Sequence, residues 1–320
     1  MNSYPKLSIA PMLDWTTPEC RRLHRLFNPD ALLYTEMIAT GAIIYGERDR
    51  YLKNYSLDKT VLQLGGGNPD ELARAVNLAQ NHGFTEINLN AGCPSDRVQH
   101  NEIGAILMKN PKKICTCLTA MQRESSVPIT LKHRLGVDEQ NERQVIDFID
   151  EILQSSPCRT FIIHARKAWL NGLNPKENRE IPPLNYDLVY EVKERFPAAR
   201  VIINGGINTM SDSQKHLQYT DGVMIGRACY QNPYLIAELA ELENKKCPSK
   251  LEILQKITAL LMQILEDGEL IASYTRHLLN LFDGIAGAKK YRRILSEEAR
   301  DKKADIAIWK KALAAVNINM

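Results

Sequence analysis

Short apolar runs alternate with amphipathic stretches along the first two thirds of the chain. Eight runs rich in Ile, Leu and Val cover residues 6–12, 31–37, 60–66, 86–92, 128–134, 160–166, 200–206 and 221–227. Between them apolar residues recur at helical spacing, which predicts helices over 69–83, 111–124 and 141–154. Strands that alternate with helices pair in parallel, and eight such units predict an α/β fold, the (β/α)8 TIM barrel. No Gly-x-Gly-x-x-Gly follows the first run, which argues against a doubly wound sheet.

The pattern changes after residue 245. A basic, proline-containing segment over 244–250 is typical of a linker, and beyond it apolar residues recur at helical spacing without strand-like runs. We therefore predict two domains, a TIM barrel over residues 1–245 and a C-terminal all-α helical bundle over 246–320.

Composition places the chain among ordinary globular proteins. Of its 320 residues 44% are hydrophobic and 25% charged, and no run of apolar residues is long enough to span a membrane. The first residues carry no basic leader, so we expect a cytoplasmic monomer with no membrane contact. Seven scattered cysteines do not indicate a disulfide framework. The pair Cys115 and Cys117 lacks a second ligand pair, so we expect no metal.

Positive charge is concentrated at the end of the chain. Residues from 250 onward contain twelve Lys or Arg and nine Asp or Glu, whereas residues 1–249 contain 29 of each. Four of these cations, Lys289, Lys290, Arg292 and Arg293, surround Tyr291. Such a cluster is either a solvated helix face or the electrostatic footprint of a phosphate backbone.

Each predicted strand ends in polar or glycine residues that its apolar body does not predict. The strand-end set is Pro11, Met12, Gln63, Asn88, Asn90, Lys132, His164, Asn204, Gly205, Gly206, Gly226 and Arg227. The carboxyl ends of barrel strands converge on one mouth, where such enzymes build their active sites. Glycines after strands seven and eight, with Arg227, predict a phosphate site. Together with Gln63, Lys132 and His164 they describe a seat for flavin mononucleotide (FMN), although each residue alone is compatible with a structural role.

Cys93 follows the fourth strand, between Gly92 and Pro94. A free cysteine is most often a small buried apolar residue. A Gly-Cys-Pro turn at the mouth of the barrel instead directs the thiol toward a ligand, where it could act as a general acid. A nucleophilic role would require a neighbouring base, which the sequence alone cannot identify.

The stretch INLNAGCPSDRV over 87–98, continued to Gly-Ala at 104–105, resembles the signature of the tRNA-dihydrouridine synthases. The resemblance extends to APMLDWT, YTEM, LQLGG, NGG and GR in the same order, and to the helical tail. Residues 164–186 resemble the long loop of the bacterial A-type enzymes that act at positions 20 and 20a of the D loop.

The resemblance implies an FMN enzyme that uses NADPH, or NADH, to saturate the C5=C6 bond of a uridine turned out of a tRNA. Hydride would pass to C6, and Cys93 would protonate C5. Carried over by motif, the FMN-binding residues are the strand-end set without Asn88 and Asn90. The residues expected to contact tRNA are Asn90, Arg97, Arg166, Lys167, Lys176, Asn178, Arg179, Lys289, Lys290, Arg292 and Arg293. Asn90 could equally cap a turn.

Two alternatives remain at this point. One is a different FMN barrel enzyme that reduces or oxidises a small pyrimidine, similar to dihydroorotate dehydrogenase, although such an enzyme has no need of a basic helical tail. The other is a non-catalytic RNA-binding protein on the same scaffold, which would not require Cys93 and a complete flavin seat.

Overall fold

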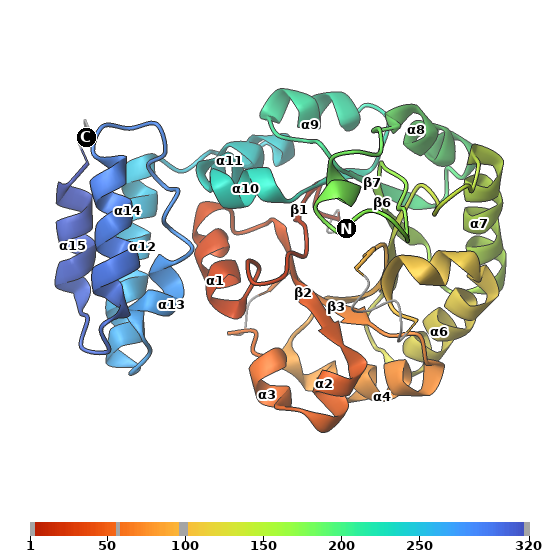
Figure 1. Ribbon diagram of the computed structural model, residues 1–320, viewed down its shortest axis with the longest axis horizontal. Coiled ribbons are helices and arrows are strands. Elements are labelled where there is room, and N and C mark those ends of the chain that lie inside the picture. The colour runs from red at the N-terminus through yellow and green to blue at the C-terminus, as the bar shows by residue number, and fades with distance from the viewer. Residues whose placement is uncertain (1–3, 56–57, 96–101, 317–320) are drawn as a thin grey trace.

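The computed structural model describes residues 4–55, 58–95 and 102–316. Eight strands, all parallel, form a closed barrel in the order β1 to β8 (Figure 1). The strands are β1 Leu7–Ile9, β2 Leu32–Ala39, β3 Thr60–Gly65, β4 Glu86–Ala91, β5 Ile129–Arg134, β6 Thr160–His164, β7 Arg200–Asn204 and β8 Gly222–Ile225. Each lies in one of the eight predicted runs, allowing for one or two residues at the ends, so the predicted barrel is confirmed.

Helices connect the strands and form the outer layer of the barrel (Figure 1). They are α1 Pro18–Phe27, α2 Thr40–Tyr45, α3 Arg48–Tyr51, α4 Pro69–Ala79, α6 Pro111–Glu124, α7 Glu142–Ser155, α8 Tyr186–Arg195, α9 Met210–His216, α10 Arg227–Gln231 and α11 Tyr234–Glu238. Short 3-10 turns lie at Gln80–His82, Gly104–Lys109, Glu177–Arg179, Leu239–Glu243 and Glu298–Arg300.

Local side chains explain where the predicted helices begin and end. Asn141 accepts a hydrogen bond from Gln144 N and forms a capping box, so α7 begins one residue later than predicted. The helix predicted over 69–83 is α-helical only to Ala79 and then tightens into a 3-10 turn. Gly83 follows at φ +74°, a left-handed conformation that ends helices and favours glycine.

The interior of the barrel is apolar on one side and polar on the other. Seven buried apolar residues form a separate cluster inside it: Ala10, Leu32, Tyr34, Val61, Ile162, Ile202 and Met224. Beyond Val61 on β3, and on β4 and β5, the buried inward positions are instead polar: Gln63, Glu86, Asn88, Asn90, Thr130 and Arg134. TIM-barrel interiors are usually filled by layers of branched apolar side chains, so packing does not explain these buried polar residues.

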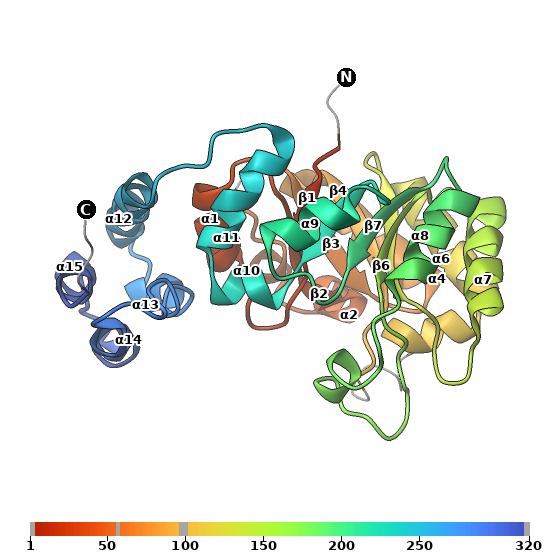
Figure 2. The same cartoon turned by 90° about the horizontal axis from the view of Figure 1, so that it is seen from above.

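Four helices follow the barrel, as expected from the tail: α12 Lys250–Glu266, α13 Ile271–Thr275, α14 Ala288–Glu297 and α15 Ile306–Ala314. They stand beside α1, at one side of the barrel (Figures 1 and 2). Trp309 is fully buried among them and donates a hydrogen bond from Nε1 to Thr258 Oγ1 at 2.9 Å. Arg22 of α1 donates to Tyr274 OH of α13 at 3.1 Å, which ties the barrel to the C-terminal helices.

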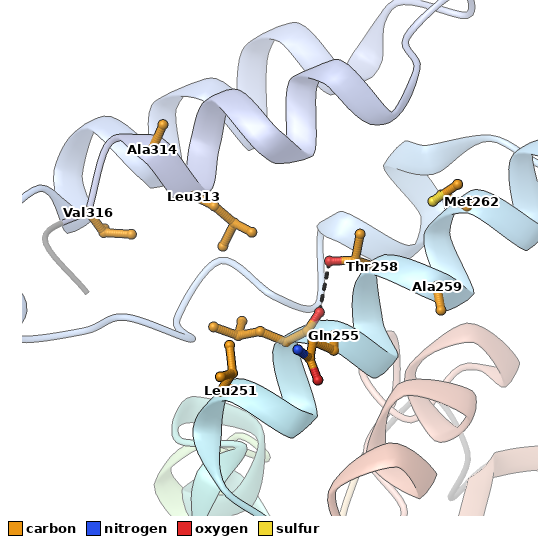
Figure 3. A pocket seen from close by; sticks show the side chains of 9 residues that line it. Leu251, Gln255, Thr258, Ala259, Met262, Leu313, Ala314 and Val316 are labelled. Carbon is orange, nitrogen blue, oxygen red and sulfur yellow. Dashed lines mark hydrogen bonds between the residues drawn. The ribbon is translucent and has the colours of Figure 1, made fainter. Parts of the chain in front are cut away.

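An apolar groove of about 570 Å³ lies between α12 and α15 (Figure 3). Leu251, Met262 and Leu313 line it, and Thr258 turns its hydroxyl inward along α12 to bond Leu254 O at 2.8 Å. No strand-end residue contributes to this groove, so it is separate from the mouth of the barrel. In the described parts of the chain, no helix has the length and hydrophobicity needed to cross a membrane.

Candidate active site

The carboxyl ends of the central strands bring the predicted polar residues into neighbouring registers. Asn90 of β4 lies opposite Lys132 of β5, and His164 of β6 lies opposite Asn204 of β7. The Lys132 ammonium donates a hydrogen bond to Asn204 Oδ1 at 3.2 Å, which links β5 to β7. These four residues therefore share one end of the barrel interior.

The backbone around Cys93 is held from two directions. Asn90 Oδ1 accepts hydrogen bonds from Gly92 N at 3.0 Å and Cys93 N at 2.9 Å. The Cys93 carbonyl accepts from Ala105 N at 2.8 Å. A Cβ on Gly104, at φ +82°, would lie 2.4 Å from the Cys93 carbonyl oxygen, so only glycine allows this approach. Cys93 remains partly exposed within this fixed turn.

Cations surround the thiol, and burial disfavours their charge. Burial lowers the pKa of Lys132 to about 7; Arg134 adds to this shift, whereas Cys93 opposes it. Burial also lowers the pKa of Arg179, and Cys93 again opposes the shift. The pKa of His164 falls well below its usual value because the ring is buried and then because Arg134 and Lys132 are near. His164 is therefore neutral at pH 7.

Arg134 is a site residue that the sequence analysis missed. Its side chain is 3% exposed, and its Nε donates to Gly92 O at 2.9 Å. Its Nη1 donates to Lys167 O at 2.9 Å and to Asn178 O at 2.8 Å. One guanidinium thus joins the Cys93 turn to the loop after β6. The inward alternation of Thr130, Lys132 and Arg134 along β5 was the signal that could have identified it.

Glycines after β7 and β8 form a tight cradle beside His164. Gly205 has φ +112°, and a Cβ there would lie 2.5 Å from His164 Cδ2. A Cβ on Gly206 would lie 2.6 Å from Leu184 Cδ1. Tyr186 OH donates to Gly205 O at 2.9 Å and fixes the turn. These backbone segments approach their neighbours as closely as a phosphate-binding turn must approach its anion.

The ends of β1 and β8 meet on the other side of this cradle. A Cβ on Gly226 would lie 3.6 Å from Met12 Sδ, and Thr16 Oγ1 accepts from Met12 N at 3.0 Å. Pro11 and Met12 are both partly exposed. Arg227 is exposed and donates from Nη1 to Glu180 Oε1 at 3.3 Å, which uses only part of the donor capacity of its guanidinium.

Sequence comparison agrees with this geometry. The sequence model of the family described as "Dihydrouridine synthase (Dus)" matches residues 8–317. The chain belongs to the dihydrouridine synthase family. It is 45% identical over 315 residues to the tRNA-dihydrouridine(20/20a) synthase of Vibrio vulnificus, covering 97% of each chain. It is 46% identical to the enzymes of the same name from Pasteurella multocida, covering 97% of this chain and 96% of that one, and Escherichia coli, covering 98% and 96%.

Structural comparison supports the fold of this family member. A solved structure of morphinone reductase in complex with tetrahydroNAD superimposes with a TM-score of 0.52. The alignment covers 78% of this chain and 90% of that one, at 13% sequence identity. At that identity the likeness shows a shared barrel and nothing further.

The long loop after β6 carries five of the residues expected to contact tRNA, and one expectation needs correction. Asn178 is fully buried: its Oδ1 accepts from Trp169 N at 2.8 Å, and its Nδ2 donates to Trp169 O and Leu173 O at 2.9 Å. Its amide holds the loop together and is not available to RNA. The loop projects beyond the strand ends (Figure 2).

The other four loop residues differ in how freely their charges face solvent. Lys176 and Arg179 are exposed. Arg166 is partly buried and donates to Pro182 O, while Lys167 donates from Nζ to Asp138 O at 3.2 Å. The loop therefore offers two exposed cations for RNA and two that also bond the protein backbone.

The remaining residues predicted to contact tRNA also differ in how accessible they are. Asn90 is 8% exposed and uses its oxygen on the Cys93 turn, so the structure favours the turn-cap alternative. On α14, Lys289, Lys290 and Arg293 are exposed, whereas Arg292 pairs with Asp283. Arg97 lies outside the described residues.

His133 faces away from the mouth. The sequence analysis placed only the lysine of this strand at the flavin, and the structure packs His133 between Phe148 of α7 and Phe161 of β6 at ring distances of 5.2 and 5.9 Å. Burial lowers the pKa of His133 to about 4, so the ring is neutral. Among the described residues, no group of three or more His, Cys, Asp or Glu side chains is arranged to hold a metal ion.

Proposed function

We propose that this protein reduces the C5=C6 bond of uridines 20 and 20a in the D loop of tRNA, using FMN and NADPH. The observation that carries the proposal is near-full-length identity of about 45% to enzymes named tRNA-dihydrouridine(20/20a) synthase, combined with a partly exposed thiol within electrostatic range of Lys132. The flavin, when bound, would supply the hydride, and the chain supplies position, charge and a proton.

The residues present fit an anionic flavin nucleotide. The Gly205–Gly206 turn, Gly226 and Arg227 would hold the phosphate through backbone N–H groups and the guanidinium. His164, Leu184 and Tyr186 leave no room for a Cβ at Gly205 or Gly206. Lys132 lies partly buried with Asn204 and would place its charge beside the flavin ring. Gln63, Pro11, Met12 and His164 would complete the seat. Anion binding would favour the charged form of Lys132, which burial alone disfavours.

Cys93 would hold the proton that is delivered to C5 of the uracil ring. Its backbone is fixed by Asn90 and Ala105, so the thiol is oriented before a substrate arrives. Lys132, Arg134 and Arg179 interact electrostatically with Cys93. These cations would stabilise the thiolate left after proton transfer.

The tRNA would lie across two parts of the chain, residues 1–245 as the flavin-binding barrel domain and residues 246–320 as a helical tRNA-binding domain. Lys289, Lys290 and Arg293 on α14 present charge to solvent without a described partner. Arg166, Lys167, Lys176 and Arg179 are next to the mouth on the loop after β6. Turning a base out of its stack costs a few kcal/mol, which such phosphate contacts would offset.

Mapping dihydrouridine in tRNA tests the proposal. A strain that lacks this protein should lose the modification at positions 20 and 20a, and the wild-type gene should restore it. The purified protein should be yellow and should act on bulk tRNA but not on dihydroorotate. Restoration by a Cys93→Ala variant, or retention of both modified positions without the protein, would contradict the assignment.

A further inference from the structure

A continuous chain of hydrogen bonds runs through the polar half of the barrel, from the Cys93 turn to Glu86 at the opposite end of β4. Asn90 Nδ2 donates to Gln63 Oε1 at 2.8 Å, and Gln63 Nε2 donates to Asn88 Oδ1 at 2.7 Å. Asn88 Nδ2 donates to Thr130 Oγ1 at 2.9 Å. The Thr130 hydroxyl donates to Glu86 Oε1 at 2.7 Å. We call these five residues the Glu86 chain.

The chemistry of its two ends fixes the direction of every bond in the chain. The amides of Gly92 and Cys93 can only donate, so Asn90 must turn its oxygen to them and its nitrogen to Gln63. At the other end Glu86 Oε1 accepts from Thr130, and Thr130 accepts from Asn88. Both requirements give the same orientation for all three side-chain amides.

Three hydroxyl groups donate hydrogen bonds to the Glu86 carboxyl group. Besides Thr130, Tyr34 OH donates to its Oε1 at 3.1 Å and Tyr4 OH donates to its Oε2 at 2.9 Å. The guanidinium of Arg200 lies 4.1 Å from the centre of the Tyr4 ring. Burial raises the pKa of Glu86, and the three hydroxyl donors oppose that shift. Glu86 is 3% exposed, and its carboxyl group accepts three hydrogen bonds, two on Oε1 and one on Oε2.

Packing alone does not require this arrangement. Seven apolar residues fill much of the rest of the barrel interior, and polar groups cost free energy to bury even when they are bonded. A fully satisfied polar network, however, specifies one arrangement of its members. The members at the mouth are Gln63, which the family resemblance places at the flavin, and Asn90, which holds the Cys93 turn.

We propose that Glu86 is a positioning residue for the reaction, which through Thr130 and Asn88 fixes the amide orientation of Gln63 and Asn90 and thereby the seat of the flavin and the Cys93 turn. A flipped Gln63 amide would direct its nitrogen at the Asn90 nitrogen and its oxygen at the Asn88 oxygen. A flipped Asn90 would direct an N–H group at the N–H groups of Gly92 and Cys93. The inference rests on the proposed function and names residues that it did not include.

Two matched pairs of variants test the chain. Thr130→Val removes the hydroxyl that joins Asn88 to Glu86 with little change of shape, and Thr130→Ser keeps it. Glu86→Met removes the acceptor, whereas Glu86→Gln can still accept from Thr130 and Tyr34 on its oxygen and donate to Tyr4. Either pair decides the question if the other fails to fold.

Three measurements are made on each variant: the dissociation constant of FMN by flavin fluorescence, the rate of Cys93 alkylation by iodoacetamide against pH, and steady-state kcat and KM for tRNA. Leaving a buried donor unpaired typically disturbs an equilibrium by about tenfold. We expect Thr130→Val and Glu86→Met to weaken FMN binding and to lower kcat about tenfold, with an altered alkylation profile and an unchanged KM. Thr130→Ser and Glu86→Gln should stay within about twofold of wild type.

Lower stability in Thr130→Val and Glu86→Met with wild-type FMN affinity, alkylation profile and kcat would reduce the chain to core packing and overturn the proposal. Equal losses in both members of a pair would also overturn it, because the retained hydroxyl or amide oxygen would then be irrelevant. Absence of dihydrouridine formation by the wild-type protein would count against the proposed function alone. FMN affinity and the alkylation profile would then still test whether the Glu86 chain positions the flavin seat and the Cys93 turn.

Discussion

Flavin binding should take up a proton at alkaline pH, and Lys132 should be the group that takes it. Burial holds the pKa of Lys132 at about 7 in the protein without ligand. At pH 8 roughly one tenth of the molecules then carry the charge, and at pH 6 roughly nine tenths do. The hydrogen-bond acceptors of the flavin ring, beside Nζ, favour the charged form. Binding should therefore take up about 0.9 proton per flavin through Lys132 at pH 8, and less at lower pH, where Lys132 is already charged.

The same linkage sets the pH dependence of affinity. The charged form of Lys132 binds the flavin ring more tightly, and its population falls about tenfold for each pH unit above the pKa. Between pH 7.5 and pH 9 the dissociation constant of FMN should rise about 25-fold. A phosphate monoester loses its second proton near pH 6, so the ligand itself does not change charge in this window.

Isothermal titration calorimetry measures both quantities. Titrations of FMN into flavin-free protein in buffers of different ionisation enthalpy give the proton uptake, and the isotherms give the affinity. Lys132→Met is the control, because it keeps the length of the side chain and removes the titrating group. A wild-type uptake below about 0.2 proton at pH 8, or an equal uptake in Lys132→Met, would refute the assigned pKa and the place of Lys132 at the flavin.

Four further outcomes follow from the same structure. Cys93→Ala should keep FMN and tRNA affinity and lose nearly all dihydrouridine formation in a single-turnover assay; wild-type turnover would exclude the thiol as the acid. Arg134→Lys cannot satisfy the three carbonyls that Arg134 joins, so urea denaturation should show a free energy of unfolding lower by about 2–4 kcal/mol. An unchanged free energy of unfolding would contradict the role of Arg134 in joining the Cys93 turn to the loop after β6. Replacing Lys289, Lys290 and Arg293 by Ala should weaken tRNA binding and flatten its salt dependence, whereas replacing the exposed Lys302, Lys303 and Lys310 removes the same charge as a control; equal slopes in both triples would place the RNA elsewhere. Without flavin, the pKa of Lys132 in the folded protein lies below its value in the unfolded chain, so the unfolded chain binds more protons between pH 7 and about 10. The free energy of unfolding of the wild type should therefore rise with pH in that window and fall toward pH 7, and Lys132→Met should lack this slope.

The fold was predictable because its signal is distributed over many residues. Eight apolar runs and the helices between them repeat the same periodicities, so an error of one or two residues at a boundary does not change the topology. The polar residues at the strand ends were predictable for a related reason. A closed parallel barrel brings all its carboxyl ends to one mouth, so Lys132, His164 and Asn204 could be grouped before their contacts were known.

The direction and the partners of single polar side chains were not predictable. Asn178 lies in a basic loop and has the composition of an RNA contact, yet three backbone groups of its own loop occupy its amide. Arg292 belongs to a cluster of four cations in the sequence, and only in the structure does Asp283 pair with it. Such partners come from turns and helix phases that propensity does not determine, because a tertiary contact outweighs the local preference.

The two halves of the barrel interior indicate how rigidity at the mouth is achieved. Arg134 holds the Cys93 turn from the loop after β6, and the Glu86 chain holds it from within the barrel through Asn90. Gly92 is bonded by both, with its carbonyl accepting from Arg134 and its amide donating to Asn90. A thiol that must face one carbon of a flexible RNA gains rate when its own position is fixed in advance. The polar residues of β3, β4 and β5 therefore lie where the turn needs support.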